Sequence, residues 1–136
     1  MTIAEQIGSG PVAANNPPRR ISIVDDDQSI REALKSLMRS ARFSVEAFAS
    51  AEEFLASERV RDTSCLILDV TLPGMNGFEL QNHLRREGHV IPIIFITAHA
   101  DDASRQRALK GGALEFLGKP VRWEPLFKAI QSAFEE

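Results

Sequence analysis

Residues of the types that bind metal ions and phosphate follow separate apolar runs of the chain. They are Asp25, Asp26 and Asp27 after the first run, Asp69 after the third, Thr97 after the fourth, and Lys119 with Pro120 after the fifth. Several carboxylates gathered in one crevice raise each other's pKa unless a cation neutralises them. An oxygen-only ligand set suits Mg²⁺ or Mn²⁺. With a metal and an ammonium to absorb charge, a carboxylate can accept a phosphoryl group, which makes Asp69 the candidate nucleophile.

The rest of the chain must form the elements that bring these residues together. From Ile21 onward, short apolar runs alternate with helical patterns, as is typical of a parallel sheet covered by helices on both faces. The predicted strands are Ile21–Val24, Phe43–Phe48, Cys65–Leu68, Ile93–Ile96 and Leu114–Leu117. The predicted helices are Ile30–Ala41, one that begins with a capping box of Ser50 and Glu53, Phe78–Arg86, Asp102–Lys110, and one from about Pro125.

The strand patterns also predict the order of the sheet. The third and fourth runs are unbroken, which is typical of strands buried on both faces, whereas the second alternates and the fifth contains Glu115. This favours the order 2-1-3-4-5 of the flavodoxin-like, doubly wound (βα)5 fold of the α/β class. Ligands of such sheets bind beyond the carboxyl ends of the strands, where the candidate residues would share one rim. The polar helix Asp102–Lys110 offers only Ala103, Ala108 and Leu109 to the core, so we expect it to be the most weakly held.

Length and composition fit one domain without an unusual charge. The chain has 136 residues and a net charge of −3, and its longest apolar run is too short to span a bilayer. We therefore expect a cytoplasmic protein without direct nucleic-acid or membrane contact. Residues 1–20, rich in Gly, Pro, Ala and Asn, are predicted to be a flexible tail, and residues 21–136 to be the folded domain.

Five ordered motifs resemble the receiver domains of two-component response regulators, most closely those that precede LuxR-type DNA-binding domains. The motifs are Val24-Asp25-Asp26, the segment 68–77 (Leu-Asp-Val-Thr-Leu-Pro-Gly-Met-Asn-Gly), Ile96-Thr97-Ala98, Gly112-Ala113, and Phe116-Leu117-Gly118-Lys119-Pro120. Each motif alone is common, but the ordered set is specific and covers residues 21 to about 134.

The resemblance implies a role for each matched residue. Asp69 would be the phosphoacceptor, and Mg²⁺ would be held by Asp25, Asp26, Asp69 and the backbone carbonyl of Thr71, with Asp25 acting through a bound water. Thr97 and Lys119 would bind phosphoryl oxygens, Phe116 would be the switch aromatic, and Pro73, Gly77 and Pro120 would shape loops, Pro120 after a cis peptide bond. From their positions two residues beyond Asp69 and Thr97, Thr71 and His99 are candidates for tuning hydrolysis of the phosphorylated aspartate.

The resemblance also implies partners. A histidine kinase or a histidine phosphotransfer protein would donate the phosphoryl group, and the face made by the fourth helix, fifth strand and fifth helix would signal to a downstream protein. A homodimer formed on phosphorylation is a further candidate partner. Such a domain assists its own phosphorylation and dephosphorylation but is not a turnover enzyme.

Three other functions fit parts of the pattern. A haloacid-dehalogenase-type phosphatase also uses an aspartate nucleophile, but it needs a second aspartate two residues later, where this chain has Thr71. A flavin-binding domain of the same fold needs a phosphate loop after the first strand, where acids would repel the phosphate. A receiver used as a binding module without phosphorylation is the third alternative. Among the three acids after the first strand, Asp27 could have no role other than that of a helix N-cap.

Overall fold

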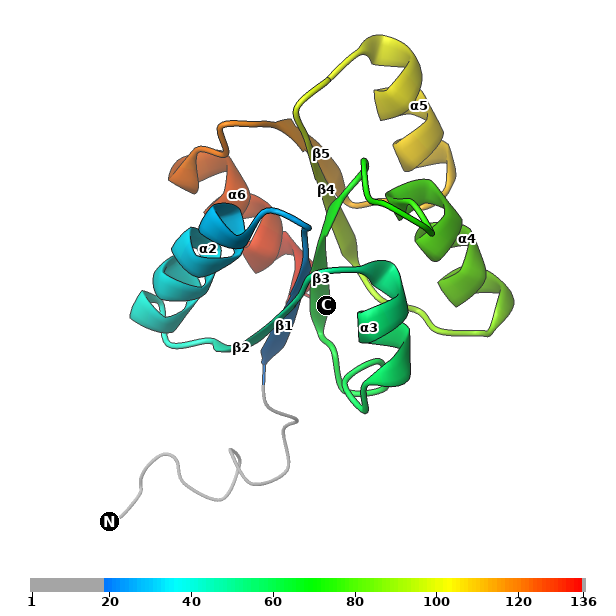
Figure 1. The fold of residues 1–136 in the computed structure, drawn as a ribbon. Helices are drawn as coiled ribbons and strands as arrows, with labels where there is room; N and C mark the ends of the chain where they lie inside the picture. The colour runs from blue at the N-terminus through cyan, green and yellow to red at the C-terminus, as the bar shows by residue number, and fades with distance from the viewer. Residues whose placement is uncertain (1–18, 136) are drawn as a thin grey trace.

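The computed structural model describes residues 19–135, which are built around one parallel sheet. The strands are Arg20–Val24 (β1), Ser44–Phe48 (β2), Cys65–Asp69 (β3), Ile93–Thr97 (β4) and Glu115–Gly118 (β5). All four neighbouring pairs are parallel, and the order is β2-β1-β3-β4-β5 (Figure 1). The flavodoxin-like order predicted from the apolar runs is therefore confirmed. The unbroken third and fourth runs form β3 and β4, in which every residue is buried.

Five helices cover the two faces of the sheet. They are Gln28–Ser40 (α2), Ala51–Ala56 (α3), Gly77–Arg86 (α4), Asp102–Lys110 (α5) and Trp123–Ala133 (α6). Helices α2 and α6 lie on one face, while α3, α4 and α5 lie on the other (Figure 1). The core is correspondingly divided into two buried apolar clusters. Within residues 19–135, no helix has the length and apolar character needed to cross a membrane.

Side-chain caps fix the first residue of most helices. Asp27 accepts hydrogen bonds from the backbone N–H groups at the start of α2, and Ser50, Asn76 and Asp101 do the same for α3, α4 and α5. The predicted box at Ser50 is only half formed, because the Glu53 carboxylate accepts from Ala49 N–H instead of Ser50 N–H. A full capping box lies at Asn76 and Glu79, where the sequence analysis did not predict one.

Several predicted boundaries differ from the structure by one or two residues. The predicted tail, residues 1–20, mostly lies outside the described residues, but Arg20 pairs with Ser44 and so belongs to β1. Strand β2 begins one residue later than predicted and β5 is shifted by one residue. Helix α6 begins at Trp123, which places Pro125 within the first turn, where a missing backbone N–H costs no helical hydrogen bond.

Helix α5 is attached to the domain mainly by polar contacts. Of its three expected core residues only Ala108 is buried, while Ala103 and Leu109 are exposed. The buried Gln81 of α4 donates to the Ala108 carbonyl oxygen at 3.0 Å, and Arg105 donates to the Phe116 carbonyl oxygen of β5 at 3.1 Å. The helix thus buries little apolar surface, as predicted. Hydrogen bonds to backbone carbonyl oxygens also hold it, and the apolar pattern of the helix does not indicate them.

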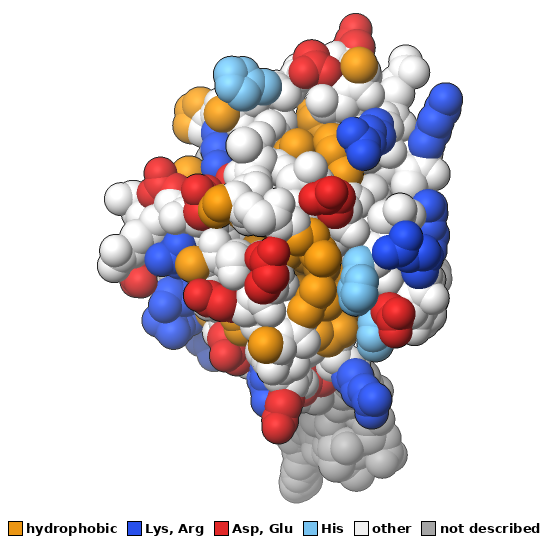
Figure 2. Space-filling view, turned by 45° about the vertical axis from the view of Figure 1, so that its right-hand side comes forward, with side chains coloured by type: hydrophobic (Ala, Val, Ile, Leu, Met, Phe, Trp, Pro, Cys, Tyr) orange, Lys and Arg blue, Asp and Glu red, His pale blue; other side chains and the backbone are white. Residues whose placement is uncertain are grey.

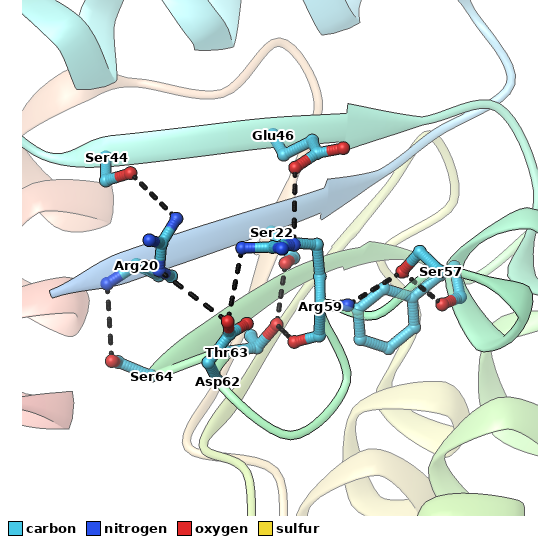
Figure 3. A network of polar contacts seen from close by, with 10 residues as sticks. Arg20, Ser22, Ser44, Glu46, Ser57, Arg59, Asp62, Thr63 and Ser64 are labelled. Atoms are coloured by element: carbon cyan, nitrogen blue, oxygen red, sulfur yellow. Dashed lines mark hydrogen bonds and ion pairs between the residues drawn. The ribbon is translucent and has the colours of Figure 1, made fainter. Parts of the chain in front are cut away.

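A polar network lies at the end of the sheet where strands β1 and β3 begin (Figure 3). Ser22 of β1 is buried, and its hydroxyl lies 2.7 Å from the Thr63 hydroxyl. The Thr63 hydroxyl donates to the Arg59 carbonyl oxygen, so the Ser22 hydroxyl is the donor between the two side chains. Arg59 also pairs with Asp62 at 3.1 Å and with Glu46 at 3.7 Å. This network connects β1 and β2 to the loop before β3.

Replacing Thr63 with Val is expected to lower the free energy of unfolding by about 1–2 kcal/mol, because the buried Ser22 hydroxyl loses its acceptor. Denaturant unfolding followed by circular dichroism measures this change. Thr63→Ser keeps the hydroxyl and should lose clearly less. Equal stability of the Val variant and the parent chain would show that the Ser22–Thr63 contact contributes nothing.

Candidate functional site

The sheet register places the candidate site residues at one end of the strands. Val24 pairs with Leu68, so Asp25 leaves β1 beside Asp69, the last residue of β3. Asp69 in turn pairs with Ile96, and Thr97 pairs with Gly118, the residue before Lys119. The parallel strands therefore deliver all of these side chains to the same end of the sheet, as the apolar runs predicted.

The centre of the site is an ammonium group between two buried carboxylates. Lys119 Nζ lies 2.9 Å from Asp25 Oδ2 and 3.1 Å from Asp69 Oδ2. The Asp25 side chain is fully buried, and that of Asp69 is 5% exposed. The Lys119–Pro120 peptide bond is cis, as expected, and Lys119 N–H donates to the Thr97 carbonyl oxygen. The loop after β5 is thereby joined to β4 beside the acids.

Burial and charge perturb both partners of this ion pair. The pKa of Asp69 is raised, chiefly by burial and then by the charge of Asp25, while hydrogen bonds from Lys119 and from Thr71 N–H oppose the rise. Burial lowers the pKa of Lys119, but the two carboxylates outweigh burial and the net shift is upward. Two carboxylates face a single ammonium here, and this imbalance favours binding of a further cation.

Three carboxylates could hold that cation. One oxygen each from Asp25, Asp26 and Asp69 lies within 4.8 Å of the other two. The buried Asp25 Oδ2 accepts no hydrogen bond from the described residues, although the Lys119 ammonium is close to it. Asp26 is exposed, which gives the cluster an opening to solvent. Oxygen ligands with an open side fit Mg²⁺, which retains several waters.

Thr71 contacts the site through its backbone. Its N–H donates to Asp69 Oδ1 at 3.1 Å, so one Asp69 oxygen faces this amide and the other faces Lys119. The Thr71 side chain is exposed. The role of its carbonyl oxygen as a metal ligand stays a prediction.

The hydroxyl of Thr97 bonds to its own loop. Thr97 is buried, and its Oγ1 accepts a hydrogen bond from His99 N–H at 3.1 Å. The exposed His99 therefore contacts Thr97 through its backbone. To donate to a group on Asp69, the Thr97 hydroxyl would turn its O–H away from the His99 carbonyl oxygen, 3.5 Å away, and could keep the hydrogen bond that it accepts from His99 N–H.

The Phe116 ring is fully buried, with its centroid 6.4 Å from that of Phe95. Arg105 covers it, with the guanidinium carbon 5.5 Å from the ring centroid. The ring packs in the apolar cluster beneath α4 and α5. Its role as the switch aromatic stays a prediction.

The loop after Asp69 is held close to β3. Gly77 N–H donates to the Val70 carbonyl oxygen, and a Cβ at Gly77 would lie 2.5 Å from the Asp69 carbonyl oxygen. A side chain at position 77 would therefore push α4 away from the site. The exposed Pro73 begins the turn, and Gly74 continues it with φ of +71°.

Comparison with known proteins identifies the family. Residues 21–131 match the model of the response regulator receiver domain. The chain belongs to this family. It is 48% identical over 115 residues to nodulation protein W of Bradyrhizobium diazoefficiens, covering 85% of this chain and 51% of that protein. It is 46% identical over 115 residues to response regulator protein TodT of Pseudomonas putida, with the same two coverages.

Solved structures agree with this receiver fold. The response regulator StyR superposes with a TM-score of 0.79 at 46% identity, covering 85% of this chain and 59% of that one. The FixJ-N structure superposes with a TM-score of 0.77 at 34% identity, covering 87% and 94%. This receiver spans about half the length of the curated relatives named above.

Two contacts of the receiver site were not predicted. Arg31 Nη1 donates to the Asp25 carbonyl oxygen at 2.8 Å, and the Glu52 carboxylate accepts from Met75 N–H at 2.8 Å in the loop after Asp69. The Met75 hydrogen bond lowers the pKa of Glu52. Arg31 lies in the first turn of α2, which directly follows Asp25, Asp26 and Asp27. Its closeness to these acids in the sequence could have suggested the contact. For Glu52 no sequence signal exists, because Glu52 and Met75 are 23 residues apart in the chain.

Proposed function

We propose that Asp69 accepts a phosphoryl group from the phosphohistidine of a histidine kinase or a histidine phosphotransfer protein. An Asp69 carboxylate oxygen would form the new bond to phosphorus as the bond from phosphorus to the histidine nitrogen breaks. The observation on which this rests is the position of Lys119 Nζ between Asp25 and Asp69. An ammonium at this point can pair with a phosphoryl oxygen after transfer.

Asp25, Asp26 and Asp69 would hold the metal ion, together with the Thr71 carbonyl oxygen. A bound Mg²⁺ or Mn²⁺ would supply positive charge that stabilises the transferring group. The phosphatase alternative lacks support, because the residue two positions after Asp69 is a threonine without an acidic group. The domain would assist its own phosphorylation and dephosphorylation instead of turning over a substrate.

The signal would be transmitted by the face formed by α5, β5 and α6. A phosphoryl oxygen on Asp69 offers the Thr97 O–H a charged acceptor in place of the His99 carbonyl oxygen, which lies 3.5 Å away. Movement of Thr97 would change the packing over the buried Phe116, and α5 has little apolar burial to resist it. A downstream protein, or a second copy of the receiver, would recognise the changed face. We place this signalling in the cytoplasm.

A small-molecule phosphodonor tests the proposal directly. Incubation with acetyl phosphate and Mg²⁺ is expected to add one phosphoryl group per chain, because the site needs a metal to neutralise its carboxylates. Intact-protein mass spectrometry measures the addition. A chelator should prevent it. A chain that remains unmodified with Mg²⁺ and also fails to bind beryllofluoride would contradict phosphoryl acceptance.

A further inference from the structure

Three cations between α4 and α5 form no ion pair within residues 19–135. Arg85, Arg107 and Lys110 line a cavity of about 300 Å³, together with Phe78, Glu79, Gln81, Asn82 and Gly111. None of the three forms a salt bridge with a described acid. The single acid in the lining, Glu79, is engaged in the capping box at the start of α4. The cavity therefore concentrates positive charge on a chain whose net charge is −3.

Neutral groups hold the two guanidinium groups of this cavity in place. Arg85 donates to the Gly111 carbonyl oxygen at 3.2 Å and to Asn82 Oδ1 at 3.1 Å. Arg107 stacks on Phe78, with its guanidinium carbon 4.4 Å from the ring centroid. Their positions are thus set before any ligand arrives, which lowers the entropy lost on binding. Lys110 forms no side-chain hydrogen bond or ion pair with the described residues, so its charge is available to a ligand.

The geometry points to a docking site for an acidic segment of a partner protein. We propose that aspartate or glutamate side chains of the partner enter this cavity and pair with Arg85, Arg107 and Lys110. Lys and Arg side chains gather on the side of α4 and α5 in Figure 2. Guanidinium groups match carboxylates in a planar, two-point geometry. A nucleic acid is a poorer fit, because three cations around one cavity offer few contacts to a long phosphate backbone.

The docking site is independent of phosphoryl acceptance. It uses none of the residues around Asp69, so its failure would leave the proposed function intact. Electrostatic pairing at an exposed site weakens as salt screens the charges. An acidic partner should therefore bind more tightly at low ionic strength.

Titration of the full chain into a fluorescein-labelled hexaglutamate peptide tests this site. Fluorescence anisotropy at low salt should show saturable binding that weakens as salt is added. Lys110→Glu is expected to weaken binding by about tenfold, because it replaces attraction with repulsion inside the cavity. Arg107→Gln should weaken it by about threefold, since it removes one exposed charge pair.

Arg86→Glu is the matched control for Lys110→Glu. Both residues are exposed, lie in the last turn of their helices and undergo the same change of charge, but Arg86 lines a different cavity, beside Met75. At about 0.15 M ionic strength, where the screening length is about 8 Å, the control should retain hexaglutamate affinity within about twofold. Equal losses in the two variants would show binding to overall charge and overturn the proposal. The proposal would also be overturned if the peptide did not bind. A single-stranded oligonucleotide that bound, and lost affinity in Lys110→Glu, would then indicate a nucleic acid as the ligand of this cavity. Circular dichroism shows whether each variant is folded. If Lys110→Glu is unfolded, the test rests on Arg107→Gln.

Discussion

An Asp69→Asn receiver is expected to take up no phosphoryl group from acetyl phosphate or from a phosphorylated kinase. The amide nitrogen and oxygen of asparagine are far weaker nucleophiles than a carboxylate, whereas the Thr71 N–H and Lys119 can still bond to an oxygen at this position. Intact-protein mass spectrometry should show the unmodified mass under conditions that modify the parent chain.

The same variant should change stability in a pH-dependent way. Because the pKa of Asp69 is raised in the folded state, the folded chain holds this proton more tightly than the unfolded chain. In the presence of a chelator, the parent chain therefore loses stability as pH rises from about 4 through the raised pKa. Asparagine does not titrate, so Asp69→Asn should become the more stable protein across that range. Denaturant unfolding at several pH values measures the difference.

Asp102→Asn is the matched control, because Asp102 is an exposed acid at the start of α5 and lies outside the cluster of Asp25, Asp26 and Asp69. It should be phosphorylated like the parent chain. Phosphoryl uptake by Asp69→Asn equal to that of the parent would mean that another residue is the acceptor.

The sequence was sufficient to predict the sheet and the position of its acids. Unbroken apolar runs predicted β3 and β4 at the centre, and the rule that ligands bind beyond strand ends then brought Asp25, Asp69 and Lys119 together. The 2.9 Å and 3.1 Å contacts of Lys119 agree with that prediction. Such inference works where a residue's place follows from the strand that precedes it.

Side-chain conformations and contacts between surface helices were beyond sequence reasoning. The hydrogen bond between Thr97 and His99 depends on a side-chain rotamer, and the burial of Phe116 depends on how α5 packs. Helix α5 is attached through Gln81 and Arg105, whose bonds go to backbone carbonyls that any sequence would offer. Because every residue has a backbone carbonyl oxygen, the residue type does not show which one accepts a hydrogen bond. Such hydrogen bonds therefore give no periodic pattern in the sequence.

Lys119→Met should separate the two roles of the ammonium group, because methionine keeps an apolar stem but removes the charge. Without the ammonium, Asp25 and Asp69 lose the cation between them, so we expect the free energy of unfolding in chelator to fall by about 3 kcal/mol at neutral pH. The raised pKa of Lys119 means that the parent chain has the full ion pair at this pH and loses it only above the ordinary lysine range.

Mg²⁺ binding and phosphoryl uptake should respond to Lys119→Met in opposite directions. Calorimetry should show Mg²⁺ affinity rising by about tenfold, since a positive charge that repels the ion is gone. Phosphoryl uptake at saturating Mg²⁺ should nevertheless slow by on the order of a hundredfold, because the transferring group loses a charged donor. Lys110→Met, at an exposed lysine of α5, should change neither quantity. General damage to the fold would weaken metal binding and phosphorylation together, so a fall in Mg²⁺ affinity would contradict the placement of Lys119 as the cation that balances these acids.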